Sequence, residues 1–567
     1  MKLKQAIVVT LIFAIIGTQL VVGFAKKPAL TQEQRIFHVL NRLGFGPRPG
    51  DVERVKAMGL ENYINQQLAP EKITDTVAEN KVKDLSVLTM STAELYEKYP
   101  QPAQIIRRLQ ETGTLPKEMA DGPENASPKN PRENEDYRKA VQDYYKEKGL
   151  QQPQRMMAEL HASRILRAVY SERQLQEVMV DFWTNHFNVF AGKGADRWLL
   201  PAYDRDTIRP NAMGKFSALL QATAQSPAML FYLDNFQSVS PNANANRPRA
   251  QQMLANVPAA QQRRGINENY ARELMELHTL GVDGGYTQKD VQEVARCFTG
   301  WTIFQPRGGA FAPMQLRGDA ARRTAGTFFF NARTHDDGEK IVLGQKIPAG
   351  GGFNDGLKVL DILARHPSTA KFIATKLVRH FVSDTPSPAL VDRVAAAFTR
   401  SDGDIRETLK AIFFSNEFNS AEAYRAKVKR PFELVISAIR TLGADTNGGP
   451  GTHQWIARMG EPLYGFQTPN GYSDAAESWV NTGGLLERMN FGIALAGNRV
   501  QGTRVDLTKL VEANTDKSKM IDESLKEILA GEVSTATKET LLKQLDQADP
   551  IAKVVGLILG TPEFQRQ

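Results

Sequence analysis

One short stretch of this sequence joins a carboxylate to an imidazole at a spacing that could support chemistry. Asp181 and His186 bound the run Asp-Phe-Trp-Thr-Asn-His, which ends a predicted helix. A carboxylate and an imidazole gathered at a helix end could ligate a divalent metal or move a proton. The alternative is a core helix in which Trp183 and His186 form hydrogen bonds inside the protein. We therefore name Asp181 and His186 as candidate metal ligands and keep both interpretations.

A second stretch, residues 267–281, holds the densest set of residues that could do chemistry. Glu268, Arg272 and Glu276 follow an i, i+4, i+8 spacing, which is typical of ion pairs along an ordinary helix. In the alternative interpretation, carboxylates would act as acid and base while Arg272 orients an anionic group. Glu268, Arg272 and Glu273 are the candidate catalytic residues, and periodicity does not decide between the two interpretations.

A third stretch, residues 334–340, places His335 directly beside Asp336. Both could ligate a metal, although adjacent residues need further ligands from elsewhere in the chain. A turn between two strand-like pieces is the alternative. We name His335 and Asp336 as candidate metal ligands.

Helices must position most of these side chains. Thr31, Ser171 and Thr287 each precede a helical pattern and have Gln or Asp three residues later, as in a capping box. Strand signals are few and short, at residues 302–304, 327–330 and 340–343. The sequence predicts a mainly α fold, a large multi-helical globular domain with one small antiparallel β element. Further helices are predicted at 50–67, 153–170, 215–225, 267–280, 356–364, 369–382, 389–399, 404–414, 431–442, 483–497, 535–545 and 550–559.

Composition excludes several classes of protein. The chain has 567 residues, of which 41% are hydrophobic and 24% charged, so it is expected to fold. Its 71 basic and 63 acidic residues are interleaved, which argues against nucleic-acid binding. Cys297 is the only cysteine, so an internal disulfide, c-type haem and an iron–sulfur cluster are excluded. The sequence has no nucleotide-binding motif.

The first residues indicate export. Lys2 and Lys4 precede an apolar run that ends near small residues at Gly23 and Ala25, as in a secretory signal peptide. We expect a periplasmic or secreted protein with no membrane span once the signal is removed. The predicted organisation is a signal peptide (1–25), a main helical domain (26–500) with loop insertions at 111–139 and 238–264, and a C-terminal helical tail (501–567).

Several motifs together resemble the bacterial family named "domain of unknown function 1800". The resemblance runs from about residue 35 to residue 496. It rests on His38-Val-Leu-Asn-Arg-Leu-Gly-Phe-Gly-Pro47, Asp181-Phe-Trp-Thr-Asn-His186, Asn267-Glu-Asn-Tyr-Ala-Arg-Glu-Leu274, Gly285-Tyr-Thr-Gln288, Phe298-Thr-Gly-Trp301, His335-Asp336, Lys429-Arg-Pro431 and Trp479-Val-Asn481. It implies a mainly helical, often exported protein encoded beside an exported family that resembles sulfatases and alkaline phosphatases. It implies no catalytic residue.

Two classes of function remain open. In the first, the protein is an enzyme or metal-dependent protein that acts on cell-envelope or extracellular polymers, with the candidate residues meeting in one pocket and a divalent metal as the possible cofactor. In the second, it is a non-catalytic partner or export scaffold for a neighbouring sulfatase-like or alkaline-phosphatase-like protein. In that case the same polar side chains lock helices together through satisfied buried hydrogen bonds.

Overall fold

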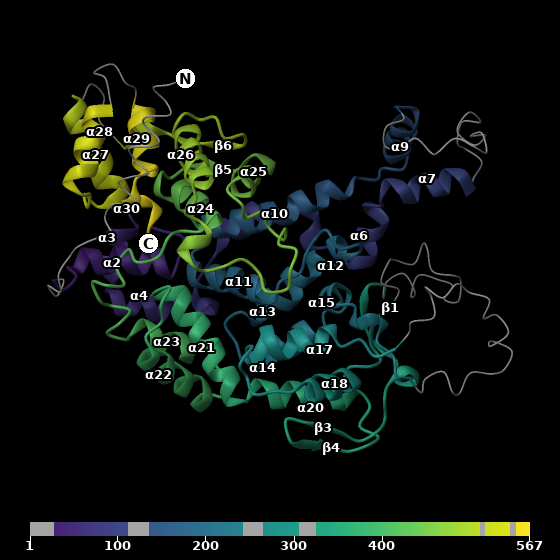
Figure 1. Ribbon diagram of the computed structural model, residues 1–567. Helices are drawn as coiled ribbons and strands as arrows, with labels where there is room; N and C mark the ends of the chain where they lie inside the picture. Colours follow the sequence, from purple (N-terminus) through teal and green to yellow (C-terminus); the bar gives the residue numbers. More distant parts are fainter. Residues whose placement is uncertain (1–27, 112–134, 242–264, 305–324, 511–515, 545–550) are drawn as a thin grey trace.

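The protein is built almost entirely of helices, which confirms the predicted mainly α class (Figure 1). The computed structural model describes residues 28–111, 135–241, 265–304, 325–510, 516–544 and 551–567. The predicted signal peptide lies outside the described residues, as do residues 112–134 and 242–264 of the two predicted insertions.

The first third of the chain forms a series of short helices followed by the long α10. The capping box predicted at Thr31 is confirmed, because its hydroxyl accepts from the Gln34 N–H and the Gln34 side chain accepts from the Thr31 N–H. The single helix predicted over 50–67 is two helices, since Gly59 interrupts it at φ 88°. The helices are α2 (Gln32–Arg42), α3 (Asp51–Met58), α4 (Leu60–Gln67), α5 (Thr76–Val82), α6 (Thr92–Lys98), α7 (Pro102–Glu111), α9 (Glu135–Glu147), α10 (Pro153–Tyr170) and α11 (Gln174–His186).

The predicted helix start at Ser171 lies three residues too early. The Ser171 hydroxyl donates to the carboxylate of Asp75 at 2.8 Å and accepts from the Arg173 N–H at 3.0 Å, so it is engaged outside the helix. The helix α11 therefore begins at Gln174, with Arg173 as its N-cap residue. A long-range partner has replaced the local cap that the sequence pattern indicates.

The central part of the chain alternates α-helices with π-helical turns. The helices are α12 (Asp196–Ala202), the π-helix η4 (Tyr203–Ile208), α13 (Arg209–Asn211), α14 (Phe216–Ala224), α15 (Pro227–Tyr232), α17 (Asn269–Glu273), the π-helix η8 (Leu274–Thr279) and α18 (Gln288–Cys297). The capping box predicted at Thr287 opens α18. The helix predicted over 267–280 changes to π geometry at Leu274, where the Thr279 hydroxyl donates to the Leu274 carbonyl at 2.7 Å.

The strands pair locally rather than in one sheet. The six strands of the described residues are β1 (Trp301–Phe304), β2 (Thr327–Phe330), β3 (Lys340–Val342), β4 (Gln345–Ile347), β5 (Asp445–Thr446) and β6 (Thr503–Arg504). They form three separate antiparallel pairs, β1 with β2, β3 with β4 and β5 with β6. The third predicted strand therefore turns back on its own neighbour instead of joining the first two.

The second half of the chain returns to helices. They are α20 (Phe353–Ala364), α21 (Pro367–Phe381), α22 (Pro388–Arg400), α23 (Ile405–Phe413), α24 (Pro431–Thr441), α25 (Pro450–Arg458), α26 (Thr482–Ala496), α27 (Lys517–Leu529), α28 (Thr535–Gln544), α29 (Ile551–Leu559) and α30 (Pro562–Gln565). Single 3-10 turns lie at η1 (Pro70–Lys72), η2 (Ser86–Leu88), η5 (Asn235–Gln237), η10 (Ala332–Thr334), η11 (Ala476–Ser478) and η12 (Leu507–Lys509).

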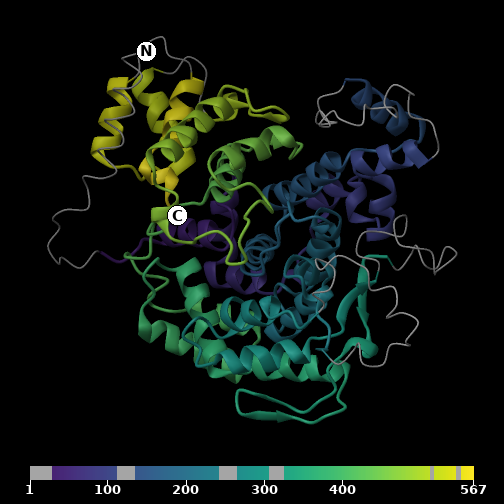
Figure 2. The same ribbon diagram turned by 45° about the vertical axis from the view of Figure 1, so that its right-hand side comes forward.

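One continuous hydrophobic core joins most of these elements. It extends from Ile36 in α2 to Phe564 in α30, and the C-terminal helices contribute Ile521 and Val555 to it. Two smaller clusters lie beneath α6 and between α7 and α9. Figures 1 and 2 show the yellow helices α27 to α30 grouped at one corner and the β3–β4 hairpin projecting from the lower edge.

Among the described residues, none of the helices has the length and the apolar character that crossing a membrane requires.

Candidate functional site

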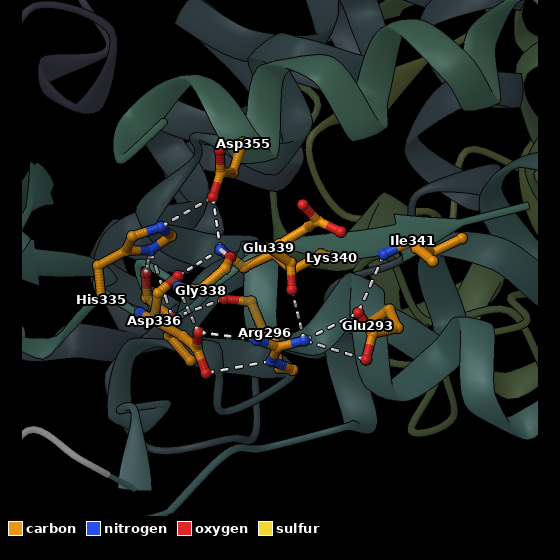
Figure 3. Close-up of polar contacts among 10 residues, drawn as sticks. Glu293, Arg296, His335, Asp336, Gly338, Glu339, Lys340, Ile341 and Asp355 are labelled. Carbon is orange, nitrogen blue, oxygen red and sulfur yellow. Dashed lines mark hydrogen bonds and ion pairs between the residues drawn. The ribbon is translucent and has the colours of Figure 1, made fainter. Parts of the chain in front are cut away.

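His335 lies in a buried ion-pair cluster between the β3–β4 hairpin and α20 (Figure 3). Its Nδ1 is 2.8 Å from the Thr299 carbonyl oxygen, and its Nε2 is 3.2 Å from the Asp355 carboxylate. The same carboxylate accepts from Lys340 Nζ at 2.6 Å, and the Lys340 side chain is 0% exposed. Both imidazole nitrogens therefore already have protein partners, and the arrangement ties the hairpin to the N-terminal turn of α20.

Asp336 turns the other way and binds α18. Its two carboxylate oxygens accept from Arg296 at 3.0 and 3.1 Å, a bidentate pair, and one of them also accepts from the Gly338 N–H at 3.0 Å. Burial opposes ionisation, but these hydrogen bonds together hold the pKa of Asp336 below its usual value. Arg296 in turn pairs with Glu293 at 2.8 Å. Asp336 and His335 thus face different partners although they are adjacent in sequence (Figure 3).

Asp181 lies between two buried guanidinium groups. One oxygen accepts from Arg164 at 2.7 Å and the other pairs with Arg430. Arg430 also pairs with Glu461 at 2.7 Å, so a network of charges links α10, α11, α24 and the segment after α25. Buried charges are retained when each finds such partners. The Asp181 carboxylate is fully engaged within the protein.

His186 is sealed in the aromatic core at the end of α11. Its Nε2 is 3.1 Å from the His278 carbonyl oxygen, and its ring packs edge-on against Phe187. Burial, then the charge of Lys376, holds the pKa of His186 well below its ordinary value, so the ring is neutral. Trp183 donates to the Ala212 carbonyl at 3.0 Å. The two side chains form hydrogen bonds inside the protein, as the core-helix interpretation expected.

Glu268 and Arg272 form a surface ion pair. Their charged groups are 3.6 Å apart, and both bind the side chain of Gln288 at the start of α18, at 2.7 and 2.8 Å. The triangle fastens α17 to α18 on the protein surface. Glu273 is separate from it and lines a cavity beside α15. Burial, then the nearby Glu276, raises the pKa of its carboxyl group.

The predicted site residues therefore do not meet in one pocket. Asp181 and His186 share α11 but have different partners, and His335 with Asp336 lies in the separate cluster described above. Within the ranges that the structure describes, no group of three or more His, Cys, Asp or Glu residues is arranged to hold a metal ion.

A long, largely irregular segment, residues 460–479, forms one wall of a different candidate site, a groove described below. We call this segment the strap; it connects α25 to α26 and crosses the middle of the molecule as a yellow-green coil in Figure 1. Asn185 at the end of α11 donates to the Tyr472 carbonyl at 2.8 Å and accepts from the Tyr472 N–H at 2.7 Å. Asn188 donates to the carbonyls of Phe466 and Thr468 at 3.0 and 2.8 Å. Two amide side chains, one within the Asp181–His186 motif and one just after it, therefore hold the strap in place.

A groove of about 890 Å³ lies between the strap and α21. This volume is within the range of about 300–1,000 Å³ that ligand sites occupy. Two cationic side chains, Lys376 and Arg379, line the groove from α21, while Tyr472 and Trp479 contribute aromatic rings from the strap. The groove combines charge with apolar surface, as ligand sites commonly do.

Most of the acidic groups in the groove are already neutralised. Asp474 is 3.1 Å from His380 Nδ1, and Asp384 pairs with Lys427. Lys427 also donates to the Asp474 carbonyl at 2.6 Å. Burial works against it, but the hydrogen bond from His380 and the surrounding cations hold the pKa of Asp474 well below its usual range. Glu477 is the one remaining carboxylate among the described lining residues, and it lies exposed at the rim.

Lys376 and Arg379 differ from these acids because they have no ion-pair partner within 4.0 Å among the described residues. Burial lowers the pKa of Lys376, the charge of Asp474 opposes this effect, and the charge of Arg379 adds a smaller lowering. The ring of Phe372 is 5.7 Å from its ammonium group. A desolvated, unpaired ammonium group that lines a groove favours the binding of an anionic group from outside.

The family of the chain follows from its match over nearly its whole length. Residues 38–566 match a family model described as "Protein of unknown function (DUF1800)". The chain belongs to this family. No curated protein and no solved structure matches it.

Several DUF1800 motifs quoted from the sequence meet at the strap. The Asp181–His186 motif supplies the clamp of Asn185, and the Lys429-Arg430-Pro431 motif supplies the partner of Asp181. The Trp479-Val-Asn481 motif supplies Trp479 in the groove and Asn481, which caps α26 by accepting from the Gly484 N–H at 2.8 Å.

Sequence reasoning did not identify four residues of this DUF1800 protein as site residues, namely Lys376, Arg379, His380 and Asp474. The one local signal was the run from Gly471 to Ala475, which half-matches a nucleophile motif and lies in the strap.

Proposed function

We propose that this protein binds an anionic ligand in the groove between the strap and α21. The observation that carries the proposal is the pair Lys376 and Arg379, two cations that line the groove and have no ion-pair partner within 4.0 Å among the described residues. The ligand would supply the missing negative charge, a carboxylate, phosphate or sulfate group. Tyr472 and Trp479 would pack against its apolar part.

The ligand is proposed to come from a cell-envelope or extracellular polymer. This part of the proposal depends on the predicted signal peptide of residues 1–25, which would deliver the protein to the periplasm or the medium. Fractionation of cells that produce the full chain tests it. An unprocessed protein recovered among cytosolic proteins would contradict it.

Calorimetric titration with galacturonate and with inorganic phosphate tests the binding proposal. We expect Lys376→Met to weaken binding by about tenfold or more, because one charge-assisted contact to an anion is lost. Lys371→Met is the matched control, since Lys371 lies on the same helix but pairs with Asp392 at 3.2 Å on the surface. The proposal fails if neither anion binds, or if both variants bind as the unchanged protein does.

A second function, as a non-catalytic partner of an exported sulfatase-like or alkaline-phosphatase-like protein, is favoured by a different observation. Asp181, His186 and His335 are sealed in the interior with protein partners, as expected of residues that lock helices together. Under this proposal, substituting Asp181 by Ala should lower the melting temperature without changing any ligand binding, because Asp181 pairs with Arg164 and Arg430 in the interior. Co-purification with the neighbouring exported protein would support it directly.

A further inference from the structure

The strap also borders a second cavity. This cavity of about 460 Å³ lies beside α15 and the start of α17, and its lining includes Tyr232, Asn269, Glu273 and Pro469. Gln467 of the strap lines both this cavity and the groove. The Tyr232 hydroxyl donates to the Gln467 carbonyl at 2.8 Å, which fixes the strap at the point where the two spaces adjoin.

The second cavity presents a carboxyl group that the protein leaves unpaired. Among the described residues, no hydrogen bond or ion pair engages the Glu273 carboxyl group. Lys193 lines the same cavity but is already engaged, because its ammonium group binds Asp234 at 2.7 Å and the Tyr232 carbonyl. Glu273 is therefore free to bond with a ligand. Burial and the neighbouring Glu276 raise its pKa, so it is protonated over a wider pH range than an exposed glutamate and can then donate as well as accept.

We propose that the groove and the second cavity are subsites of one site for an extended acidic oligosaccharide, which crosses the strap at Gln467. Lys376 and Arg379 hold an anionic substituent of one sugar unit. Glu273 and Asn269 bind hydroxyl groups of another unit beyond the strap. This inference rests on the proposed binding of an anion in the groove and adds the class and the minimum size of the ligand.

The chemistry of the two linings favours a sugar chain. The aromatic rings of Tyr472 and Trp479 suit the apolar face of a sugar ring, while the amides of Gln467 and Asn269 and the carboxyl group of Glu273 suit its hydroxyl groups. The two volumes, about 890 and 460 Å³, are each large enough for a separate unit. Occupying both through one covalent chain makes the second contact intramolecular, so affinity rises with chain length.

Calorimetric titration of the full chain with galacturonic acid and with its oligomers from dimer to hexamer tests the inference. We expect the hexamer to bind at least about tenfold more tightly than the monomer, because only the longer chain reaches the second cavity. Glu273→Ala should remove most of this gain, because it deletes the group that bonds with the sugar hydroxyls, and Asn269→Ala provides a second variant on the same cavity. Glu61→Ala, at an exposed glutamate on α4, is the control and should keep the full dependence on length.

The possible outcomes separate this inference from the proposal on which it rests. If the monomer and the hexamer bind equally, or if Glu273→Ala and Asn269→Ala both retain the gain, the two cavities are not joined subsites and this inference is overturned. If phosphate binds but galacturonate of every length does not, the ligand is not this kind of sugar chain and the inference is overturned, although the anion site stands. If neither phosphate nor any galacturonate binds, the proposed function itself fails.

Discussion

Asn185 and Tyr472 are 287 residues apart in sequence and form a two-way hydrogen-bonded pair. The Asn185 side chain donates to the Tyr472 carbonyl at 2.8 Å and accepts from its N–H at 2.7 Å. An amide side chain that bonds with both the N–H and the carbonyl of one residue fixes the position and the orientation of that residue's main chain. The pair connects the end of α11 with the aromatic wall of the groove, because Tyr472 lines it.

Substituting Asn185 by Ala should loosen the strap. The Tyr472 N–H and carbonyl lose their partner, and we expect unfolding free energy to fall by about 1–3 kcal/mol. Urea denaturation measures the loss, and limited proteolysis should cut residues 460–479 faster. Asn62→Ala is the matched control, since this exposed amide on α4 donates only to the carbonyl of Met58, the last residue of the preceding helix α3. Equal cleavage of the strap in both variants would show that Asn185 does not hold it.

A second prediction concerns Gly471, which adjoins this clamp. Its φ is +71°, and a Cβ atom there would lie 2.3 Å from the Asn185 carbonyl oxygen. Gly471→Ala therefore combines backbone strain with a collision against main chain. We expect a larger loss of stability than the ~1 kcal/mol that a left-handed alanine alone costs.

The chain offers a control that separates these two effects. Gly50 has a φ of +83°, and nothing lies within 4 Å of the point that a Cβ atom would occupy, so Gly50→Ala reports backbone strain alone. The difference in unfolding free energy between the two variants measures the collision. Equal losses would mean that the strap moves freely away from α11.

Local patterns predict those features whose partners are close in sequence. The capping boxes at Thr31 and Thr287 and the pairing of Glu268 with Arg272 all involve residues three or four positions apart. Such contacts form within one helical turn, so spacing alone indicates them. The mainly α class follows from the same local periodicity.

Spacing does not predict contacts that the tertiary fold creates. Lys340 lies in a charged run that is typical of a surface, yet its side chain is 0% exposed because Asp355 on α20 receives its ammonium group. The sequence pattern suggests Asp181 as a metal ligand because it does not reveal the partner of this carboxylate, Arg430, which is 249 residues away. The groove is missed for the same reason, since Lys376 and Asp474 come from α21 and the strap. Each of these contacts depends on tertiary packing between residues that are far apart in the sequence, so a short stretch of sequence does not reveal it.

Arg430 provides a third prediction, because it is a buried cation shared by several acids. It pairs with Asp181 and Glu461, and its side chain is 5% exposed. Arg430→Met would leave these carboxylates buried with less compensation, and we expect a loss of about 3–5 kcal/mol in unfolding free energy. Burial already raises the pKa of Glu461 to about 7 against the opposing charge of Arg430, so losing that charge should raise it further.

An exposed ion pair serves as the comparison for Arg430. Arg393 and Glu417 are 2.6 Å apart on the surface, and Arg393→Met should cost at most about 1 kcal/mol. Chemical denaturation of both variants near neutral pH gives the two values. Similar small losses would indicate that the Arg430 network is hydrated and contributes little.

The last prediction is a loss of stability on acidification, caused by buried neutral histidines. Burial is the largest cause that lowers the pKa of His38, His161 and His278 to about 3 and that of His453 to about 4, from an ordinary value of 6.5. Between those values the unfolded chain binds more protons than the folded one, so stability falls as the pH decreases from about 6.5 towards 4. At about pH 5 each histidine should contribute a loss of about 2 kcal/mol.

Glu461 changes the stability in the opposite direction, so the sign of the net change in unfolding free energy between the two pH values tests the prediction. Its pKa in the folded protein, about 7, lies above the ordinary value of 4.5, so its contribution to stability is present at low pH and is lost as the pH rises through 7. Four histidines should outweigh one glutamate. Urea denaturation at about pH 7.5 and pH 5 measures the difference, and His161→Phe should reduce it because the ring that stacks on His453 at 3.9 Å no longer titrates. A protein equally stable at both pH values would show that these rings gain protons without unfolding, and hence that water reaches them.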